Sequence, residues 1–457
     1  MKPNIVLFVC DDLRFDALGC AGNAQVKTPH LDQFAAEGLR FSRCSIPGGT
    51  HGAVCMPSRA MLHTGRPGLQ LPDQGQDIDD AHVMMGEHFA RKGYHTFHTG
   101  KWHNERRSFA RGFQDGDQIF FGGMDDPWAT HVQGFDPHGV YNAEQPATGK
   151  HATDLFVDTA CEFVARQPTE QPFFLSVALT SPHDPRTAPE EFHALYSVEE
   201  IELPDNFLAM HPHDTGHVTA FSPEGERVDA ARDEDLARLP RRPAEIKQHI
   251  ADYYAMTSHL DAAFGRLRAS LEARGIWENT IVAFTADHGL AVGQHGLMGK
   301  QNLYEHSLRI PLILRGPGVP KGQCCDARVC HFDLYRTFCE LIGLEVPASV
   351  AGLSLIPVWS GATGREEFYL NYANSIRGLI QDGWKLIEYA GEEGYRASQL
   401  FDLTADPREL RDRIHDPDQQ ERVLALRRRM QELRDLNGDA EHFTGKAYWS
   451  KVGAGGL

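Results

Sequence analysis

The chain alternates between continuously apolar runs and segments with helical periodicity. Apolar runs predict strands buried on both faces of a parallel sheet, at residues 4–10 (NIVLFVC), 94–100 (YHTFHTG), 171–183 (QPFFLSVALTSPH) and 280–289 (TIVAFTADHG). Segments between them predict helices, at residues 28–38, 82–93, 153–166 and 245–275. Thr28, Pro29 and Gly38 supply the start and stop signals of the first helix. This alternation predicts an α/β fold with a large mixed, mostly parallel, doubly wound sheet flanked by helices.

The alternation changes in three places. Residues 104–150 are rich in Gly, Asp, Arg and aromatic residues, and residues 184–240 are rich in Pro, His and charge, so both predict long loops over the functional edge of the sheet. Beyond Phe368, short strands with a hairpin turn at Asp382-Gly383 precede an amphipathic helix at 419–436. We therefore expect a catalytic α/β domain at residues 1–365 and a smaller C-terminal α+β subdomain, an antiparallel sheet plus a helix, at residues 366–457.

The composition excludes several classes of protein. A chain of 457 residues with 41% hydrophobic and 24% charged residues is typical of a globular protein, and its longest apolar runs are too short to span a membrane. The formal net charge of −18 disfavours binding to nucleic acid or to anionic membrane surfaces. An anionic substrate would therefore need a locally positive pocket. Nothing in the sequence predicts the oligomeric state.

The amino terminus and the cysteines bear on location. The first apolar run ends in two aspartates instead of small residues and a cleavage site, so it predicts a core strand and not a signal peptide. The nine cysteines are scattered through the chain, which favours reduced thiols and a cytoplasmic protein. A periplasmic location is the alternative if a leader has been removed.

Polar residues follow the predicted strands at their carboxyl ends. In a doubly wound sheet these ends meet in one crevice, so we expect the following side chains to lie together: Asp11, Asp12, Lys101, His103, His183, Asp287, His288 and Lys300. Three carboxylates in one place repel one another unless a divalent cation neutralises them. Oxygen ligands favour Ca²⁺ or Mg²⁺, whereas His288 favours Mn²⁺ or Zn²⁺. Fixed positive charge from Arg59, Lys101 and Lys300 suits a tetrahedral anion, which predicts a substrate with a sulfate, phosphate or phosphonate group.

Residues 55–66, CMPSRAMLHTGR, closely resemble the C-x-P-S-R modification signature of the type I, formylglycine-dependent sulfatases in the alkaline-phosphatase superfamily. The motifs DD, GKWH, SPH, DHG and a late lysine follow that family's order over most of the first 320 residues. The resemblance implies that a formylglycine-generating enzyme oxidises Cys55 to Cα-formylglycine. A geminal diol suits sulfate transfer because one hydroxyl can attack and the other can then expel sulfate.

The resemblance also implies a role for each matched residue. It implies one Ca²⁺ held by Asp11, Asp12, Asp287, His288 and modified Cys55, although the family often has asparagine where His288 stands. Arg59 would orient the diol, and Lys101 and Lys300 would hold the sulfate oxygens. We expect His183 to protonate the departing alcohol and His103 to act as the base that collapses the intermediate.

The resemblance implies a sulfatase acting on an organic sulfate monoester, and we expect the sulfate to be carried by a carbohydrate. Among candidate substrates are glycosaminoglycan fragments with uronic acids, including 2-O-sulfated ones. Arg106 and Arg107 either bind a substrate carboxylate or form a solvated face. Trp128, Phe120 and Phe121 either stack on the substrate ring or pack in the core.

Two other functions stay open. A phosphonate monoester hydrolase or phosphodiesterase of the same superfamily can share the modified cysteine; Lys101 and His103 favour sulfate, whereas His288 keeps this alternative open. The second alternative is a non-catalytic protein that binds sulfated glycans. Two further clusters could suggest metal sites, but we favour structural interpretations. His211, His213 and His217 predict a polar loop, and residues 324–331 predict a buried edge strand.

Overall fold

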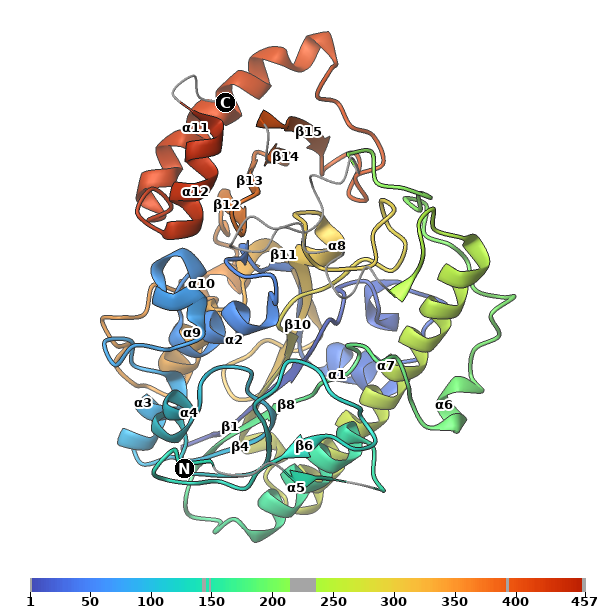
Figure 1. The fold of residues 1–457 in the computed structure, drawn as a ribbon. Helices are drawn as coiled ribbons and strands as arrows, with labels where there is room; N and C mark the ends of the chain where they lie inside the picture. The colour runs from blue at the N-terminus through green and yellow to red at the C-terminus, as the bar shows by residue number, and fades with distance from the viewer. Residues whose placement is uncertain (1, 142–144, 148, 214–235, 392–393, 454–457) are drawn as a thin grey trace.

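A computed structural model describes residues 2–141, 145–147, 149–213, 236–391 and 394–453 (Figure 1). Its larger sheet has eight strands in the order β11–β2–β10–β9–β1–β8–β4–β5. Their bounds are β11 (Gln323–Cys330), β2 (Leu39–Ser45), β10 (Arg309–Arg315), β9 (Thr280–Ala286), β1 (Asn4–Cys10), β8 (Phe173–Ala178), β4 (His95–Lys101) and β5 (Asp115–Phe120). Strands β9, β1, β8, β4 and β5 are parallel, and β10 is antiparallel to both of its neighbours. The predicted mixed, mostly parallel sheet is confirmed.

Helices cover both faces of this sheet (Figure 1). One face carries α1 (Pro29–Glu37), α5 (Ala152–Arg166) and the long α7 (Pro243–Ala273), with the short α6 (Glu190–His193) beside α7. The other side carries α2 (Cys55–Thr64), α3 (Met85–Arg91), α4 (Arg106–Gly112), α9 (Asp333–Leu341) and α10 (Ile356–Trp359). Strand β1 lies between β8 and β9 and is buried along its whole length, which explains its continuously apolar sequence. No helix within the described ranges is long and apolar enough to cross a bilayer.

A second sheet has five strands, and four of them come from the chain beyond residue 366. Its order is β15 (Arg396–Asp402), β14 (Trp384–Ala390), β13 (Ile376–Gln381), β12 (Glu367–Tyr372) and β3 (Gly48–Gly49). The hairpin predicted at Asp382-Gly383 joins β13 to β14, and both turn residues have positive φ. Helices α11 (Gln420–Leu436) and α12 (Phe443–Val452) pack on this sheet. The strand β3 comes from the segment just before α2, so this sheet joins distant parts of the sequence.

Inside the C-terminal region, one buried ion pair links a strand to the segment between the last two helices. Arg377 on β13 and Asp439 are both inaccessible to solvent, and the guanidinium donates to both carboxylate oxygens at 2.8 and 2.9 Å. The Tyr369 hydroxyl and the Trp449 indole donate to the same carboxylate, at 2.7 and 2.8 Å. Every oxygen of the Asp439 carboxylate is therefore satisfied, as a buried charge requires.

The expectation of one long loop at residues 104–150 is wrong in part. Glu105 caps α4 through its carboxylate, and β5 pairs in parallel with β4 to extend the sheet. The strand is not recognisable in the sequence because it lies at the sheet edge, where only its last two residues form an apolar, buried pair. The remaining short strands in this region are β6 (His131–Val132) and β7 (Gln145–Pro146). The buried edge strand predicted at residues 324–331 is present at the sheet edge as β11, but only its last three residues are buried.

Candidate active site

The central strands bring the predicted acidic residues together. Asp11 and Asp12 directly follow β1, and Asp287 directly follows the adjacent β9, with the last residues of the two strands in register. Lys101 is the last residue of β4, which pairs with β8 on the other side of β1. All four side chains are buried. Neighbouring parallel strands that end at one edge therefore place these groups within reach of each other, as the alternating pattern predicts.

Cys55 is the first residue of α2, and Arg59 lies one turn further along the same face. The N–H groups at a helix start are unpaired within the helix and favour negative charge, so α2 directs its positive end at the site. The Arg59 guanidinium donates to Asp287 Oδ2 at 3.0 Å and to the Lys101 backbone carbonyl at 2.6 Å. It therefore connects the ends of two strands, β9 and β4, to the helix that carries Cys55.

The carboxylates form two overlapping groups that could hold a cation. One contains Asp11, Cys55, Asp287 and His288, and the other contains Asp11, Asp12 and His183, each with its ligand atoms within 4.8 Å of one another. Asp11 Oδ1, Asp12 Oδ2 and His288 Nε2 are buried without a hydrogen-bond partner among the described residues. Buried polar atoms without partners are costly, so this donor set fits a divalent cation.

The two lysines make the site positive where Cys55 lies. Lys101 pairs with Asp11, and its Nζ lies 3.7 Å from Cys55 Sγ. Lys300 Nζ lies 2.9 Å from Asp12 Oδ1 and 3.9 Å from Cys55 Sγ. Burial disfavours the thiolate, but Lys101 and Lys300 outweigh burial and hold the pKa of the Cys55 thiol well below its ordinary value. An anion at this position is therefore strongly favoured.

The pKa values of His183 and His103 are shifted in opposite directions. Burial and Lys300 disfavour protonation of His183, but the nearby carboxylates, Asp12 first, outweigh them and raise the pKa of His183 to about 9. Its Nδ1 lies 2.8 Å from the Asp184 backbone carbonyl and 2.9 Å from Asp184 Oδ1, so this nitrogen is the donor. Burial lowers the pKa of His103, which has a hydrogen bond to the Cys55 thiol. His183 can therefore give a proton and His103 can take one.

Three contacts of the site were not predicted from the sequence. Lys101 Nζ also donates to the Gly123 carbonyl, which anchors the segment after β5 at the site. The Ser58 hydroxyl donates to the Asp287 carbonyl and lies 3.0 Å from His331 Nε2. Ser58 lies inside the signature at residues 55–59, which could have identified it as a site residue. Gly123 and His331 lie in no recognisable motif.

The predicted substrate-binding arginines have other partners. Arg107 forms an exposed ion pair with Asp80 at 2.7 Å, and the Arg106 guanidinium lies over the Phe121 ring at 5.0 Å from the ring centroid. Phe120 and Phe121 are buried, which supports core packing for both. Trp128 is 40% exposed and donates from its indole to Thr187 Oγ1 at 3.0 Å. A role of Arg106 or Arg107 in substrate binding stays a prediction.

The histidine-rich segment differs from its predicted polar loop. His211 is buried, and its Nε2 lies 2.8 Å from the Tyr304 hydroxyl. A hydrogen bond to a hydroxyl offsets the free-energy cost of burying the imidazole ring. The sequence pattern does not reveal this partner. His213 packs on Tyr389 at 5.5 Å between ring centroids. His217 lies outside the described residues.

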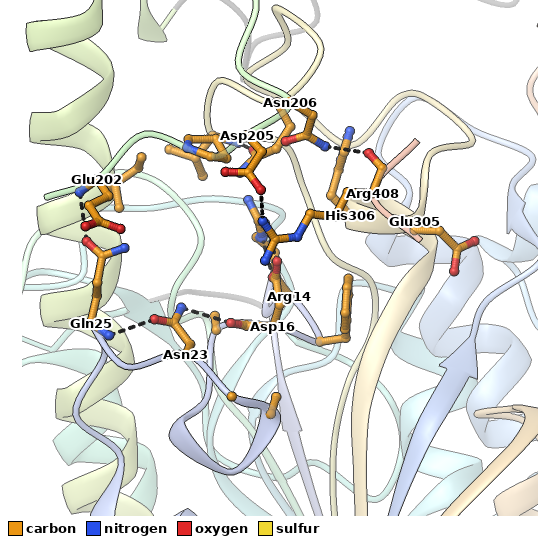
Figure 2. Close-up of a pocket in the computed structure, with 18 of the residues that line it drawn as sticks. Arg14, Asp16, Asn23, Gln25, Glu202, Asp205, Asn206, Glu305, His306 and Arg408 are labelled. Atoms are coloured by element: carbon orange, nitrogen blue, oxygen red, sulfur yellow. Dashed lines mark hydrogen bonds and ion pairs between the residues drawn. The ribbon is translucent and has the colours of Figure 1, made fainter. Parts of the chain in front are cut away.

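A cavity of about 370 Å³ lies beside the loop that follows β1 (Figure 2). Arg14, Asp16, Asp205 and Arg408 are among the residues that line it, and these four form two ion pairs: Arg14 with Asp16 at 2.7 Å, and Arg408 with Asp205. None of the residues predicted for the site lines this cavity. A much smaller hollow lies beside His183 and is lined by residues that include Gly123 and Asp184.

Comparisons with known proteins agree with this geometry. The sequence matches the family described as Sulfatase over residues 3–344, and the family described as N-sulphoglucosamine sulphohydrolase, C-terminal, over residues 293–436. An N-acetylglucosamine-6-O-sulfatase of Bacteroides thetaiotaomicron is 26% identical, over 90% of this chain and 82% of the relative.

Solved structures share the fold over nearly the whole chain. One described as in complex with its substrate D-glucosamine-2-N,6-O-disulfate has a TM-score of 0.79 at 23% identity, and the match covers 97% of this chain and 99% of that chain. The phosphonate monoester hydrolase of Agrobacterium radiobacter has a TM-score of 0.74 at 20% identity, covering 95% and 96%. The fold alone does not separate these two activities. The family match over residues 3–344 and the relatives named as sulfatases favour sulfate ester hydrolysis. The chain therefore belongs to the type I sulfatases of the alkaline-phosphatase superfamily and is a sulfuric ester hydrolase.

Proposed function

We propose that this enzyme hydrolyses a sulfate monoester on a sugar, with Cys55 oxidised to Cα-formylglycine and one Ca²⁺ bound by Asp11, Asp12, Asp287 and His288. The observation that carries the proposal is the position of Cys55, whose Sγ is within 4 Å of both Lys101 Nζ and Lys300 Nζ and belongs to a group of candidate metal ligands. The hydrated aldehyde would supply the attacking hydroxyl, and the cation would lower its pKa and polarise the sulfate.

The side chains around Cys55 divide the remaining work. Lys101 and Lys300 bind the sulfate oxygens and stabilise the charge that develops on them as the ester bond breaks. The Arg59 guanidinium donates to Asp287 Oδ2 and so fixes the start of α2, which carries residue 55, relative to the end of β9. His183 donates a proton to the departing alcohol. His103 takes the proton of the second hydroxyl when sulfate leaves, because its ring is neutral and contacts residue 55.

The hollow beside His183 bears on which sugar is cleaved. Asp125 and Asp184 line it, and no Lys or Arg is among the described residues around it. Its volume of about 10 Å³ has room for about one water-sized group, so the sugar ring would lie outside it. Carboxylates accept hydrogen bonds from hydroxyl and amide groups and repel a uronate. We therefore expect a neutral or amino sugar at this position, in preference to a uronic acid.

This proposal is tested by a mass spectrum of the peptide that contains Cys55, with assays of sulfate release from N-acetylglucosamine 6-sulfate and a 2-O-sulfated uronate. The expected result is a thiol converted to an aldehyde and faster release from the amino sugar. A fully converted protein that prefers the uronate would contradict the assignment of the hollow. One that cleaves phosphonate monoesters but no sulfate ester would favour the phosphonate hydrolase alternative, which His288 keeps open.

Replacing His183 with glutamine is expected to lower kcat on a sugar sulfate by about 100-fold or more, because the alkoxide leaves without a proton. The loss on 4-nitrophenyl sulfate is expected to be much smaller, because nitrophenolate is a good leaving group. Steady-state kinetics with both substrates measure this difference. His193→Gln, on the half-buried face of α6, is the matched control and should leave both rates unchanged. Equal decreases in kcat on the two substrates would show that His183 is not the general acid.

A further inference from the structure

The backbone of Asp12 has an unusual conformation. Its φ is +64°, in the left-handed region that residues other than glycine rarely occupy. This conformation turns the Asp12 carboxylate to Lys300 at 2.9 Å and to His288 Nδ1 at 3.1 Å. The extended conformation of the preceding strand would direct the side chain elsewhere. The position of a candidate cation ligand therefore depends on what holds this residue in an unfavourable backbone state.

A tyrosine on the long helix provides that restraint. The Tyr253 hydroxyl donates to the Asp12 backbone carbonyl at 2.7 Å and accepts from the Arg14 backbone N–H at 2.9 Å. Tyr253 is 1% exposed and lies in the middle of α7, a helix of 31 residues. Among the described residues, no other group pairs with either backbone atom. One hydroxyl thus clamps the two ends of the turn that contains Asp12 and Leu13.

Tyr253 lies between the turn on one side and the cavity described above on the other. Arg14 is fixed by its ion pair with Asp16 at the edge of the large cavity, as Figure 2 shows. Tyr253 and Tyr254 line the same cavity, so removal of the Tyr253 hydroxyl would leave the turn beside open space with no neighbouring donor.

We propose that Tyr253 is a positioning residue of the cation site: its hydroxyl holds the backbone of Asp12 so that the carboxylate faces the metal. The proposal rests on the proposed function in one respect, that the carboxylates bind a divalent cation. It assigns no contact between Tyr253 and the substrate. Groups that orient a metal ligand typically change metal affinity by about 10- to 100-fold when they are removed.

The test compares Tyr253→Phe with Tyr254→Phe. Tyr254 is the next residue and lines the same cavity, but its hydroxyl accepts from the Asn23 side chain at 3.0 Å and does not contact the turn. Calorimetric titration of chelator-stripped protein with Ca²⁺, and separately with Mn²⁺, gives the dissociation constants. We expect Tyr253→Phe to weaken binding by about 10- to 100-fold and Tyr254→Phe to leave it unchanged. Activity lost by Tyr253→Phe should return at saturating Ca²⁺.

A second measurement distinguishes weaker metal binding by Tyr253→Phe from a loss of stability in that variant. The rise in the unfolding temperature on addition of Ca²⁺ reports affinity for the folded state, whatever the starting stability. A Tyr253→Phe protein with the wild-type dissociation constant and the wild-type rise would overturn the positioning role and leave the proposed function intact. Wild-type protein that binds neither Ca²⁺ nor Mn²⁺ would overturn both.

Discussion

Replacing Cys55 with alanine is expected to lower kcat for sulfate release by about 10⁴-fold or more, because residue 55 carries the proposed nucleophile. The change removes the reacting atom and leaves Lys101 and Lys300 in place. The KM for the sulfate ester should therefore change much less than kcat. Stopped assays of inorganic sulfate at saturating substrate measure the loss directly.

Cys161→Ala is the matched control, since this half-buried thiol lies on α5, away from the strand ends. It should retain wild-type turnover. Cys55→Ser separates two chemistries, because a serine can accept sulfate but has no second hydroxyl to expel it. Serine protein that releases one equivalent of alcohol and then stops would agree with the diol mechanism. Continued turnover by Cys55→Ala would disprove the assignment of the nucleophile.

Replacing Asp439 with alanine is expected to lower the free energy of unfolding by about 3–5 kcal/mol, because the Arg377 guanidinium would remain buried without its counter-charge. Both side chains are inaccessible to solvent, and the substitution also removes the acceptor of Tyr369 and Trp449. The midpoint of urea unfolding, with its slope, measures the change.

The control for this variant is a partly exposed pair on the same sheet. Glu367 pairs with Arg429 at 2.7 Å, and Glu367→Ala should cost no more than about 1 kcal/mol. Burial opposes the charge on Asp439, but Arg377 outweighs burial and lowers the pKa of this carboxyl. A lowered pKa stabilises the fold above the carboxyl's unfolded value, near 4, and the stabilisation is lost as the pH falls through the folded value. The difference between wild type and Asp439→Ala should therefore narrow in acid. A constant difference would contradict this account.

The central strands and the long helices could be predicted because their patterns are unambiguous. Residues 4–10 are buried, and every position after Asn4 is apolar, while the 31 residues of α7 sustain a helical period. Strand β5 was not predicted, because an edge strand needs few apolar residues. The two glycines of β3 have no side chains to show a pattern, and their pairing with β12 spans more than 300 residues of sequence.

The convergence of the site residues could be predicted for those that lie directly after the predicted strands. Asp11, Asp287 and Lys101 converge because β9, β1, β8 and β4 are neighbours, which the doubly wound topology requires. Contacts made by backbone atoms could not be predicted, among them the Gly123 carbonyl on Lys101 and the Asp12 carbonyl on Tyr253. A sequence pattern describes side chains, so it contains no information about which peptide group will face a site.

The pairing of β3 with β12 has a consequence for the order of events during synthesis. Gly48 and Gly49 precede Cys55 by a few residues, but their strand partners are Asn371 and Tyr372, which leave the ribosome more than 300 residues later. Cys55 is 1% exposed once the chain has folded. An enzyme that oxidised this thiol would therefore have access to it before the chain has folded. Oxidation would then compete with the folding of the chain around Cys55.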